Sequence, residues 1–333
     1  MRLHETAAKK AGGTRYRIVD RLHIDRAAEM RRLIAGLRAT PATIEPKYFY
    51  DELGCTLYAA ICQLDEYYPT RTERAIFRQH RQEIAAAIGT GGTFVDLGAG
   101  DCCKALGWLP FIAPDRYLAV DIAGPSLEVA LAGMAPDFPE TEMIGLVTDF
   151  SRTLDIPADL LSGRTTVFYP GSSIGNFTPP EAIRFLREMR RHTLGNNGVP
   201  VGGLLIGVDA KKDRAVLNAA YADALGVTAA FNLNALRHIN RILGTDFIES
   251  GWRHVGAYNE EAGRIEMHLQ AVTAQSVQID GTTRTFAAGE QIHSENSYKY
   301  SRQEFESMLR EAGFGRVFSW TDDRAAFWVF HAS

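Results

Sequence analysis

The sequence has no run of about 18 apolar residues, and its N-terminal stretch MRLHETAAKKAGGTRYR lacks the apolar core of a signal peptide. These absences predict neither a membrane-spanning helix nor export, and we expect a cytoplasmic protein. The 36 basic and 40 acidic residues are mixed along the chain and give a formal net charge of −4. Because no basic block is present, we expect neither nucleic acid nor a membrane as a partner.

Metal-ligand spacings are missing as well. The cysteines, Cys55, Cys62, Cys102 and Cys103, fit no zinc pattern, and sequence neighbours such as Cys102 and Cys103 rarely bond to each other. The nine histidines are scattered, without a His-Glu-x-x-His pair. We therefore predict reduced, structural thiols and no metal site.

The sequence does contain enough apolar residues for a large core, with 46% hydrophobic residues over 333 positions. In its middle part, apolar strands alternate with helical stretches, which is typical of a parallel sheet covered by helices on both faces. A doubly wound α/β domain is therefore predicted. Its expected strands are TFVDLGAG (93–100), RYLAVDIA (116–123), IGLVTDF (144–150), TTVFYPGSSIGNF (165–177) and GGLLIGVDA (202–210).

The alternation ends after the fifth expected strand. Residues 213–299 hold the long helical stretch LNALRHINRILGTDF and then alternating strands that belong to no strand-helix-strand unit. This break predicts an inserted subdomain. The chain then returns with a helix, SRQEFESMLREAGF, and two short apolar strands.

Glycines follow the first expected strand in the segment DLGAGDCCK. Gly98 and Gly100 let a tight turn approach a ligand at the carboxyl end of the strand, although Gly-x-Gly alone is weak evidence. Cys103 stands where a dinucleotide-binding fingerprint has a third small residue, which disfavours a nicotinamide or flavin site. The sequence also lacks the Gly-Lys-Ser/Thr of a phosphate-binding loop, which argues against nucleotide hydrolysis.

Acidic and aromatic residues end the next two strands. Asp121 is placed to accept hydrogen bonds from ribose hydroxyls, and Asp149 with Phe150 offers an acceptor and an apolar wall for adenine. These groups predict a nucleoside cofactor without an essential pyrophosphate, and S-adenosylmethionine is the leading candidate. The C-terminal helix and two short strands are similar to the antiparallel hairpin that closes the sheet of class I methyltransferases, a likeness of fold only.

The segment HSENSYKY (293–300) places a carboxylate and a hydroxyl two residues apart. In a β-strand, Glu295 and Ser297 leave the same face, whereas Asn296 leaves the opposite one. Such a pair can bind one ligand together. The alternative is a solvated strand face before the helix-capping sequence SRQE, which is the commoner fate of these residue types.

Longer segments carry a specific resemblance. YFYDELGCTLYAAICQLDEYYPTRTERAIF, FYPGSSIGNFTPPEA, IGVDAKKD, AYADALGVTAAFNLNALRHINRILGTDF and RIEMHL closely resemble the histidine-specific Nα-methyltransferases of ergothioneine biosynthesis, from about residue 41 to the C-terminus. The resemblance implies an α/β class I methyltransferase fold, a Rossmann-like doubly wound sheet with an inserted α+β substrate-binding subdomain. The expected division is an N-terminal tail (1–20), the substrate-binding subdomain (21–70 and 213–299) and the S-adenosylmethionine-binding domain (71–212 and 300–333).

The resemblance also implies which residues line the site. Tyr50 and Tyr67 match residues around the imidazole and the amine, and both are candidate catalytic residues, with Tyr67 also binding substrate. In that family the methyl donor lies on the Rossmann-like domain. This placement implicates a cofactor-binding set made of Gly98, Gly100, Lys104, Asp121, Asp149 and Phe150.

Five further positions match substrate-binding residues of the family. Asn176 and Tyr221 match residues that bind the substrate carboxylate, and an amide and a phenol suit that group. Glu295 and Ser297 match the pair that reads the imidazole ring, and Met267 matches an apolar residue beside it. Taken singly, each has an ordinary explanation, such as a turn cap or a core tyrosine, but together they favour a site.

The implied reaction transfers three methyl groups from S-adenosylmethionine to the α-amino nitrogen of L-histidine, giving Nα,Nα,Nα-trimethylhistidine (hercynine), the first step of ergothioneine biosynthesis. We expect a monomer that needs no metal, and the proton acceptor stays open between a tyrosine, a water and solvent. One competing hypothesis is a relative acting on another aromatic amino acid or amine; Glu295 and Ser297 argue against an indole, which has one donor and no acceptor. A dehydrogenase and a noncatalytic S-adenosylmethionine-binding module are hypotheses from two further functional classes.

Overall fold

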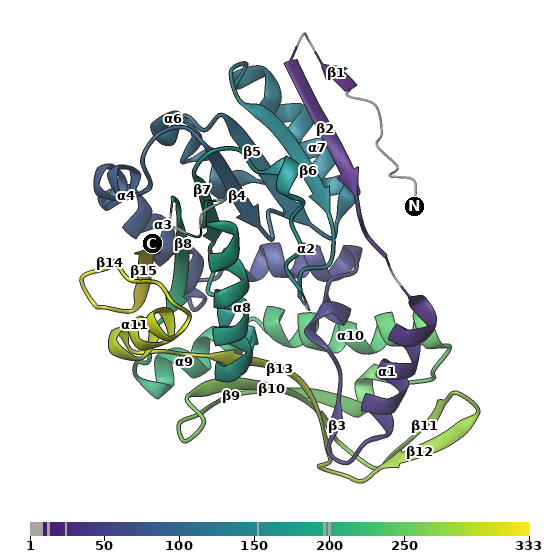
Figure 1. Cartoon of the computed structure of the whole chain (residues 1–333). Coiled ribbons are helices and arrows are strands. Elements are labelled where there is room, and N and C mark those ends of the chain that lie inside the picture. Colours follow the sequence, from purple (N-terminus) through teal and green to yellow (C-terminus); the bar gives the residue numbers. More distant parts are fainter. Residues whose placement is uncertain (1–8, 12–13, 24, 152, 196–197, 199–200) are drawn as a thin grey trace.

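A nine-stranded sheet in the order β1-β2-β6-β5-β4-β7-β8-β15-β14 forms the centre of the larger part of the molecule (Figure 1). The computed structural model describes residues 9–11, 14–23, 25–151, 153–195, 198 and 201–333. The five strands expected from the sequence are confirmed and run parallel to one another in this sheet. They are β4 (Thr93–Leu97), β5 (Arg116–Asp121), β6 (Glu142–Val147), β7 (Thr165–Tyr169) and β8 (Gly203–Asp209).

Helices cover both faces of this sheet, as the alternating pattern predicts. One face packs against α8 (Pro179–His192) and α11 (Arg302–Glu311) through residues such as Leu186 and Phe305. The other face packs against α3 (Tyr68–Gln79), α4 (Arg81–Ile88), α6 (Leu109–Ile112) and α7 (Gly124–Met134). The doubly wound arrangement is therefore confirmed. Short connecting helices are η2 (Ala135–Asp137), η3 (Ala158–Leu160) and α5 (Cys103–Leu106).

An antiparallel hairpin completes the sheet at its C-terminal edge. β15 (Phe327–Ala332) pairs antiparallel with β8, and β14 (Val317–Thr321) pairs antiparallel with β15. Together with the strand order β6-β5-β4-β7-β8, this is the class I methyltransferase topology that the resemblance implied. A capping box begins α8, because Glu181 accepts hydrogen bonds from the backbone and side chain of Thr178.

The expected N-terminal tail is wrong over residues 14–20. These residues form β2 (Thr14–Asp20), which pairs in parallel with β6, and β1 (Lys9–Ala11) pairs with β2. Tyr16 and Val19 are buried in the cores on opposite faces of the sheet. Charged neighbours hide this strand in the sequence, because a strand near the sheet edge keeps polar residues between its few buried ones. Residues 1–8 and 12–13 of the expected tail lie outside the described part of the chain.

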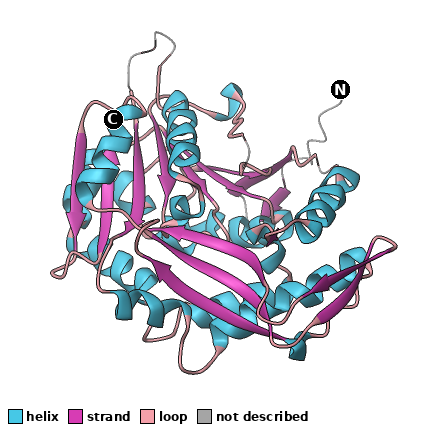
Figure 2. Ribbon diagram, turned by 90° about the horizontal axis from the view of Figure 1, so that it is seen from below, coloured by secondary structure: helices cyan, strands magenta, loops and turns pink. Residues whose placement is uncertain are grey.

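A second, smaller sheet lies below the large one in Figure 1, and Figure 2 shows it from beneath. Its order is β3-β13-β10-β9, and the hairpin β11-β12 extends from it. α2 and α10 lie between the two sheets (Figure 1). The elements are α1 (Arg26–Arg38), β3 (Ala42–Thr43), η1 (Pro46–Phe49), α2 (Glu52–Ile61), α9 (Arg214–Tyr221), α10 (Val227–Leu243), η5 (Glu249–Gly251), β9 (Trp252–Asn259), β10 (Arg264–Ala271), β11 (Gln275–Ile279), β12 (Thr282–Phe286) and β13 (Gln291–Tyr298).

One hydrophobic core joins two chain segments that are far apart in the sequence. It combines buried residues of 33–68, such as Leu37 and Phe49, with buried residues of 217–292, such as Phe231 and Ile265. Asp51 ties the same segments together by capping α2 and accepting a hydrogen bond from Asn234 of α10 at 2.7 Å. None of the helices described by the structure is long and apolar enough to cross a membrane.

The strand β2 is open to a direct stability test. Val19→Asp places an unpaired carboxylate in the core, so we expect it to lower the free energy of unfolding by about 3 kcal/mol. Asp20→Asn, at an exposed position of the same strand, serves as the control and should leave stability unchanged. Urea unfolding of both variants measures the difference, and equal stability of the two would contradict the placement of β2.

Candidate active site

The two sheets meet where β8 and β13 end. Asp209 is the last residue of β8, and its carbonyl accepts a hydrogen bond from the backbone N–H of Tyr300 at 3.1 Å. Ala210 and Tyr300 also form an isolated parallel bridge. The carboxyl edge of the large sheet, where ligands bind in open α/β folds, therefore faces residues of the small sheet.

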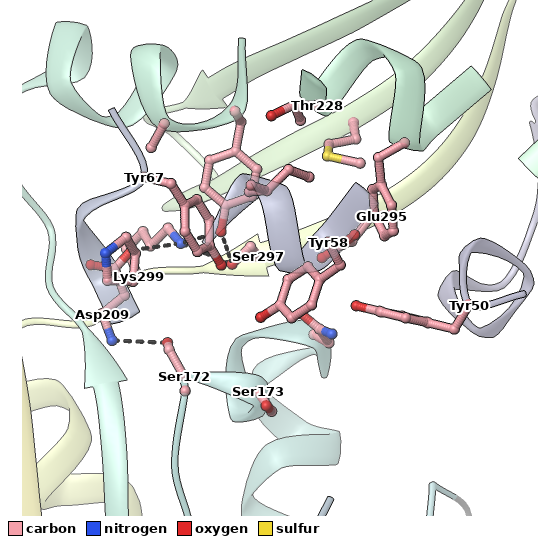
Figure 3. Close-up of a pocket in the computed structure, with 18 residues that line it drawn as sticks. Tyr50, Tyr58, Tyr67, Ser172, Ser173, Asp209, Thr228, Glu295, Ser297 and Lys299 are labelled. Carbon is pink, nitrogen blue, oxygen red and sulfur yellow. Dashed lines mark hydrogen bonds and ion pairs between the residues drawn. The ribbon is translucent and has the colours of Figure 1, made fainter. Parts of the chain in front are cut away.

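A cavity of about 650 Å³, including its open mouth, lies at this junction (Figure 3). Its wall contains all seven residues that the sequence proposes for substrate or catalysis: Tyr50, Tyr67, Asn176, Tyr221, Met267, Glu295 and Ser297. The wall also contains residues that were not predicted, and these are Tyr58, Ile61, Pro69, Gly171, Ser172, Ser173, Asp209, Ala220, Thr228, Phe231 and Lys299.

Strand β13 and Lys299, the residue that follows it, supply the polar end of the cavity by alternation along the chain. Glu295, Ser297 and Lys299 all line it, whereas Asn296 does not and instead hydrogen-bonds to His293 at 2.8 Å. The predicted outward orientation of Asn296 is therefore confirmed. Met267 of β10 stands directly opposite Glu295 in the ladder, which places an apolar side chain beside the carboxylate.

Lys299 and Asp209 form a buried ion pair behind Ser297. The Lys299 Nζ lies 2.8 Å from Asp209 Oδ2, and each side chain is 1% exposed. Tyr68 and Lys212 also donate to the Asp209 carboxylate, at 2.7 and 2.5 Å from Oδ1. Burial alone would raise the pKa of Asp209, but Lys299 and Lys212 outweigh it and hold that pKa below its ordinary value. The carboxylate therefore stays charged.

Asn176 reaches the cavity from the loop after β7. This loop forms the short helix η4 (Ser173–Asn176) just before the capped start of α8. A side chain at Gly175 would lie 2.7 Å from the carbonyl oxygen of Tyr298, so only glycine allows the loop to approach β13 this closely. Packing of η4 on β13 thus brings the amide of Asn176 to the same cavity as Ser297.

Aromatic rings enclose the remaining wall. Tyr58 of α2 lies 5.8 Å from Tyr50 and 6.5 Å from Tyr67 between ring centroids, both edge to face. Phe231 of α10 lies 5.6 Å from Tyr50, and Tyr221 lies 6.2 Å from Tyr67. In Figure 3, Tyr50 approaches from the side opposite Lys299 and Asp209. The cavity thus has an aromatic side and a charged, hydrogen-bonding side.

Burial changes the acid–base behaviour of the lining. Desolvation raises the pKa of Glu295 to about 7, an effect that Lys299 only partly offsets. Desolvation also raises the pKa of Tyr67 well above its ordinary value, and it raises the pKa of Tyr221 although Lys299 opposes it. The phenols therefore stay protonated at neutral pH, and Glu295 is an acceptor whose charge a hydrogen-bond donor would stabilise.

The glycine turn adjoins this cavity at the ends of β4 and β5. Gly98 and Gly100 adopt left-handed backbone angles, with φ of 71° and 55°. The Gly100 N–H donates to Asp121 Oδ2 at 2.9 Å, and the Ala123 N–H donates to Asp121 Oδ1 at 3.0 Å. The turn is thus locked onto Asp121. A Cβ at Gly100 would meet no atom within 4 Å, so the turn borders open space.

The residues after β6 form a second part of this edge. The Asp149 carboxylate accepts hydrogen bonds from the backbone and hydroxyl of Ser151, at 2.9 and 2.6 Å. Phe150 packs 6.1 Å from Phe185 in a stacked arrangement, so its ring is held as a fixed apolar wall. Phe150 also lies 3.7 Å from where a Cβ of Gly98 would stand, which joins it to the glycine turn.

Glu73 of α3 connects the glycine turn to the cavity. Its side chain lies 2.8 Å from the Lys104 Nζ and accepts the Gly171 N–H at 2.7 Å, while Glu73 itself is 1% exposed. Burial alone would lower the pKa of Lys104, but Glu73 outweighs it and raises that pKa. A charged ammonium is thus held beside Gly171 at the cavity wall. All six candidate cofactor residues lie along one edge.

Together these residues suit an adenosine-containing, amino-acid-bearing cofactor. Asp121 keeps acceptor capacity for ribose hydroxyls beyond its two backbone donors, Phe150 offers a flat wall, and Lys104 offers a positive charge. Cys102 and Cys103 belong to the same turn but do not line the cavity, and all four thiols are free. Within the described residues, no cluster of three or more His, Cys, Asp or Glu could hold a metal ion.

Sequence reasoning missed Lys299, Asp209, Tyr58 and Glu73. Lys299 had a readable signal, because it continues the i, i+2, i+4 face that begins with Glu295 and Ser297. Asp209 also had one, since it ends a parallel strand just as Asp121 does. Tyr58 and Glu73 lie in helical segments whose facing partners come from distant parts of the chain, so no local pattern reveals them.

A family model described as histidine-specific, SAM-dependent methyltransferase matches residues 29–333. The chain belongs to this family.

Several relatives show its breadth. The histidine N-alpha-methyltransferase of Mycolicibacterium smegmatis is 39% identical over 92% of this chain and 95% of its own length. The enzyme of the same name from Mycobacterium tuberculosis is 36% identical over 89% of this chain and 92% of its own. This chain is also similar to the 4-dimethylallyltryptophan N-methyltransferase of Claviceps purpurea, which is 25% identical over 88% of this chain and 91% of its own length.

The contacts of Glu73 with Lys104 and Gly171, called the Glu73 clasp below, predict an effect on cofactor binding. Glu73→Gln removes the charge that holds Lys104 but keeps an acceptor for Gly171, so binding of S-adenosylhomocysteine should weaken about tenfold. Calorimetric titration measures this. Glu83→Gln on the neighbouring helix, where the side chain is 67% exposed, should bind like the wild type. Unchanged affinity in Glu73→Gln would show that the clasp does not position the cofactor residues.

Proposed function

We propose that this protein methylates the α-amino nitrogen of L-histidine with S-adenosylmethionine, in three successive transfers that yield Nα,Nα,Nα-trimethylhistidine. The observation that carries the proposal is the polar end of the cavity, where Glu295 and Ser297 stand side by side on β13. A buried carboxylate and a hydroxyl match the donor and acceptor nitrogens of an imidazole ring. The relatives named for histidine methylation support the same substrate.

The rest of the cavity has groups for the remaining parts of an amino acid. Asn176 and Tyr221 can donate hydrogen bonds to the α-carboxylate, since an amide and a protonated phenol are both donors. Met267 supplies apolar contact beside the ring that Glu295 reads. Substrate held in this way spans the cavity from β13 toward the aromatic wall and the glycine-turn edge.

The aromatic wall suits a nitrogen that gains methyl groups. Tyr50, Tyr58, Tyr67 and Phe231 present ring faces and edges to one space, and a quaternary ammonium is attracted to such rings by about 0.5–2 kcal/mol each. These rings also exclude water and restrict the amine to a small region. Tyr67 is a protonated phenol at neutral pH, so it orients the amine rather than acting as a strong base.

The methyl group comes from S-adenosylmethionine, which supplies an activated methyl on a positively charged sulfur. In this proposal Asp121 holds the ribose, Asp149 and Phe150 hold the adenine, and Lys104 faces the amino-acid part, with Gly98 and Gly100 allowing close approach. The amine must lose a proton before it attacks, and direct displacement at the methyl carbon needs neither a metal nor a covalent enzyme intermediate.

A second candidate is N-methylation of another aromatic amino acid. The similarity to a relative named 4-dimethylallyltryptophan N-methyltransferase suggests this candidate. An indole offers one N–H donor and no acceptor, so Ser297 would lose its partner. Leaving such a buried group unpaired costs about 1–3 kcal/mol. Histidine is therefore the better fit to this cavity.

Mass spectrometry of L-histidine incubated with S-adenosylmethionine and the protein tests the proposal. We expect a product heavier by three CH2 units, with mono- and dimethyl forms as intermediates that disappear with time. L-Tryptophan in a parallel reaction is the matched comparison, and it should remain unmodified or react at least about tenfold more slowly, because Ser297 would be left without a partner. Turnover of tryptophan with none of histidine would overturn the substrate assignment.

A further inference from the structure

Lys299 contacts two hydroxyl groups of the cavity in addition to its charge partner Asp209. Its ammonium lies 2.8 Å from Asp209 Oδ2, 2.8 Å from Ser297 Oγ and 3.0 Å from the Tyr221 hydroxyl. Burial alone would lower the pKa of Lys299, but Asp209 outweighs it and raises that pKa, so the group stays charged. An ammonium has three N–H donors. All of them are therefore engaged by these partners.

The ammonium restricts what the Ser297 hydroxyl can do. Lys299 has no acceptor, so Ser297 accepts in this contact, and Ser297 accepts a second bond from the Tyr221 hydroxyl at 2.9 Å. Both acceptor positions of the serine oxygen are then occupied, and its single proton is left to point into the cavity. When Tyr221 donates to a substrate carboxylate instead, Lys299 still polarises Ser297, which makes it a stronger donor and a poorer acceptor.

Asp209 does not need Lys299 for charge balance alone. Lys212 contacts Asp209 Oδ1 at 2.5 Å, and Tyr68 donates to both carboxylate oxygens at 2.7 and 2.8 Å. Lys212 has its other contacts with Tyr68 and the Ala210 carbonyl, and it does not line the cavity. The two lysines thus share one carboxylate, but only Lys299 reaches the residues that line the ring end of the cavity.

We propose that Lys299 is a positioning and specificity-determining residue that fixes Ser297 as a hydrogen-bond donor, so that the site accepts a neutral aromatic ring carrying one N–H and one bare nitrogen. Glu295 accepts the N–H, and Ser297 donates to the bare nitrogen. A ring with two N–H groups would bring a donor against a donor beside the Lys299 charge. This inference rests on the proposed function, because it assigns the ring to the polar end of the cavity.

Nitrogen NMR of bound histidine tests directly, in the wild-type protein, whether Ser297 donates a hydrogen bond to a bare ring nitrogen. L-Histidine labelled with nitrogen-15 in the ring is bound together with S-adenosylhomocysteine at about pH 7.5, above the usual imidazole pKa of about 6.5. We expect a single neutral tautomer with one protonated and one bare nitrogen. The chemical shift of the bare nitrogen should be that of a hydrogen-bond acceptor. Two protonated ring nitrogens, or a tautomer mixture like that of free histidine, would overturn the proposal.

A double-mutant cycle measures the dependence on Lys299. Histidine affinity is titrated for the wild type, Ser297→Ala, Lys299→Met and the double variant, each with S-adenosylhomocysteine bound. Ser297→Ala should weaken binding about tenfold in the wild type but less than about twofold in the Lys299→Met background, because Ser297 is no longer held as a donor. The matched cycle with Lys212→Met should be additive, since Lys212 shares Asp209 but does not touch Ser297.

The outcomes separate the two proposals. Histidine binding with additive losses in both cycles would leave the function standing and overturn the role of Lys299. Binding of S-adenosylhomocysteine without any binding of histidine to the wild type would overturn both. If Lys299→Met fails to fold, as judged by circular dichroism, the wild-type NMR spectrum alone decides between a donor and an acceptor at Ser297.

Discussion

The buried ion pair between Asp209 and Lys299 is the interaction on which the cavity depends. It joins the carboxyl end of the large sheet to the end of β13, and both side chains are 1% exposed. Removing two charges from water is unfavourable unless their remaining hydrogen-bonding capacity is satisfied. Here it is satisfied by Tyr68 and Lys212 around Asp209 and by Ser297 and Tyr221 around Lys299. A stable pair of charges thus sets how far β13 stands from the cofactor edge.

This constraint separates recognition from chemistry within one cavity. In the proposed function, β13 presents fixed polar groups for the substrate ring, while α2, α10 and the chain before α3 present aromatic rings to the amine. The glycine turn, Asp121 and the residues after β6 form the opposing edge, which the Glu73 clasp connects to the cavity through Lys104 and Gly171. Direct methyl displacement requires alignment more than reactive side chains. The structure accordingly relies on rigid packing, and its buried phenols stay protonated.

The sequence predicted strands β4 to β8 of the large sheet well because each of them is a local apolar run that ends in a turn. It also predicted the outward Asn296, because strand alternation is a local property. It failed at β2, where few buried residues are spread among charges, and at Glu73 and Tyr58, whose partners are distant in the chain. The resemblance proposed seven cavity residues that the fold brings together, but it did not reveal the charges behind them. Such buried networks are set by tertiary contacts that no spacing encodes.

In the proposed function, the Glu295 carboxylate on β13 accepts a hydrogen bond from a ring nitrogen of histidine bound between the two sheets. Calorimetric titration of L-histidine into the wild type and Glu295→Ala, each saturated with S-adenosylhomocysteine, tests it most directly. Loss of a buried acceptor should weaken histidine binding about tenfold or more, while S-adenosylhomocysteine binds both proteins alike. Equal histidine affinity in the two proteins would contradict the account, because Glu295 would then have no part in recognising the substrate.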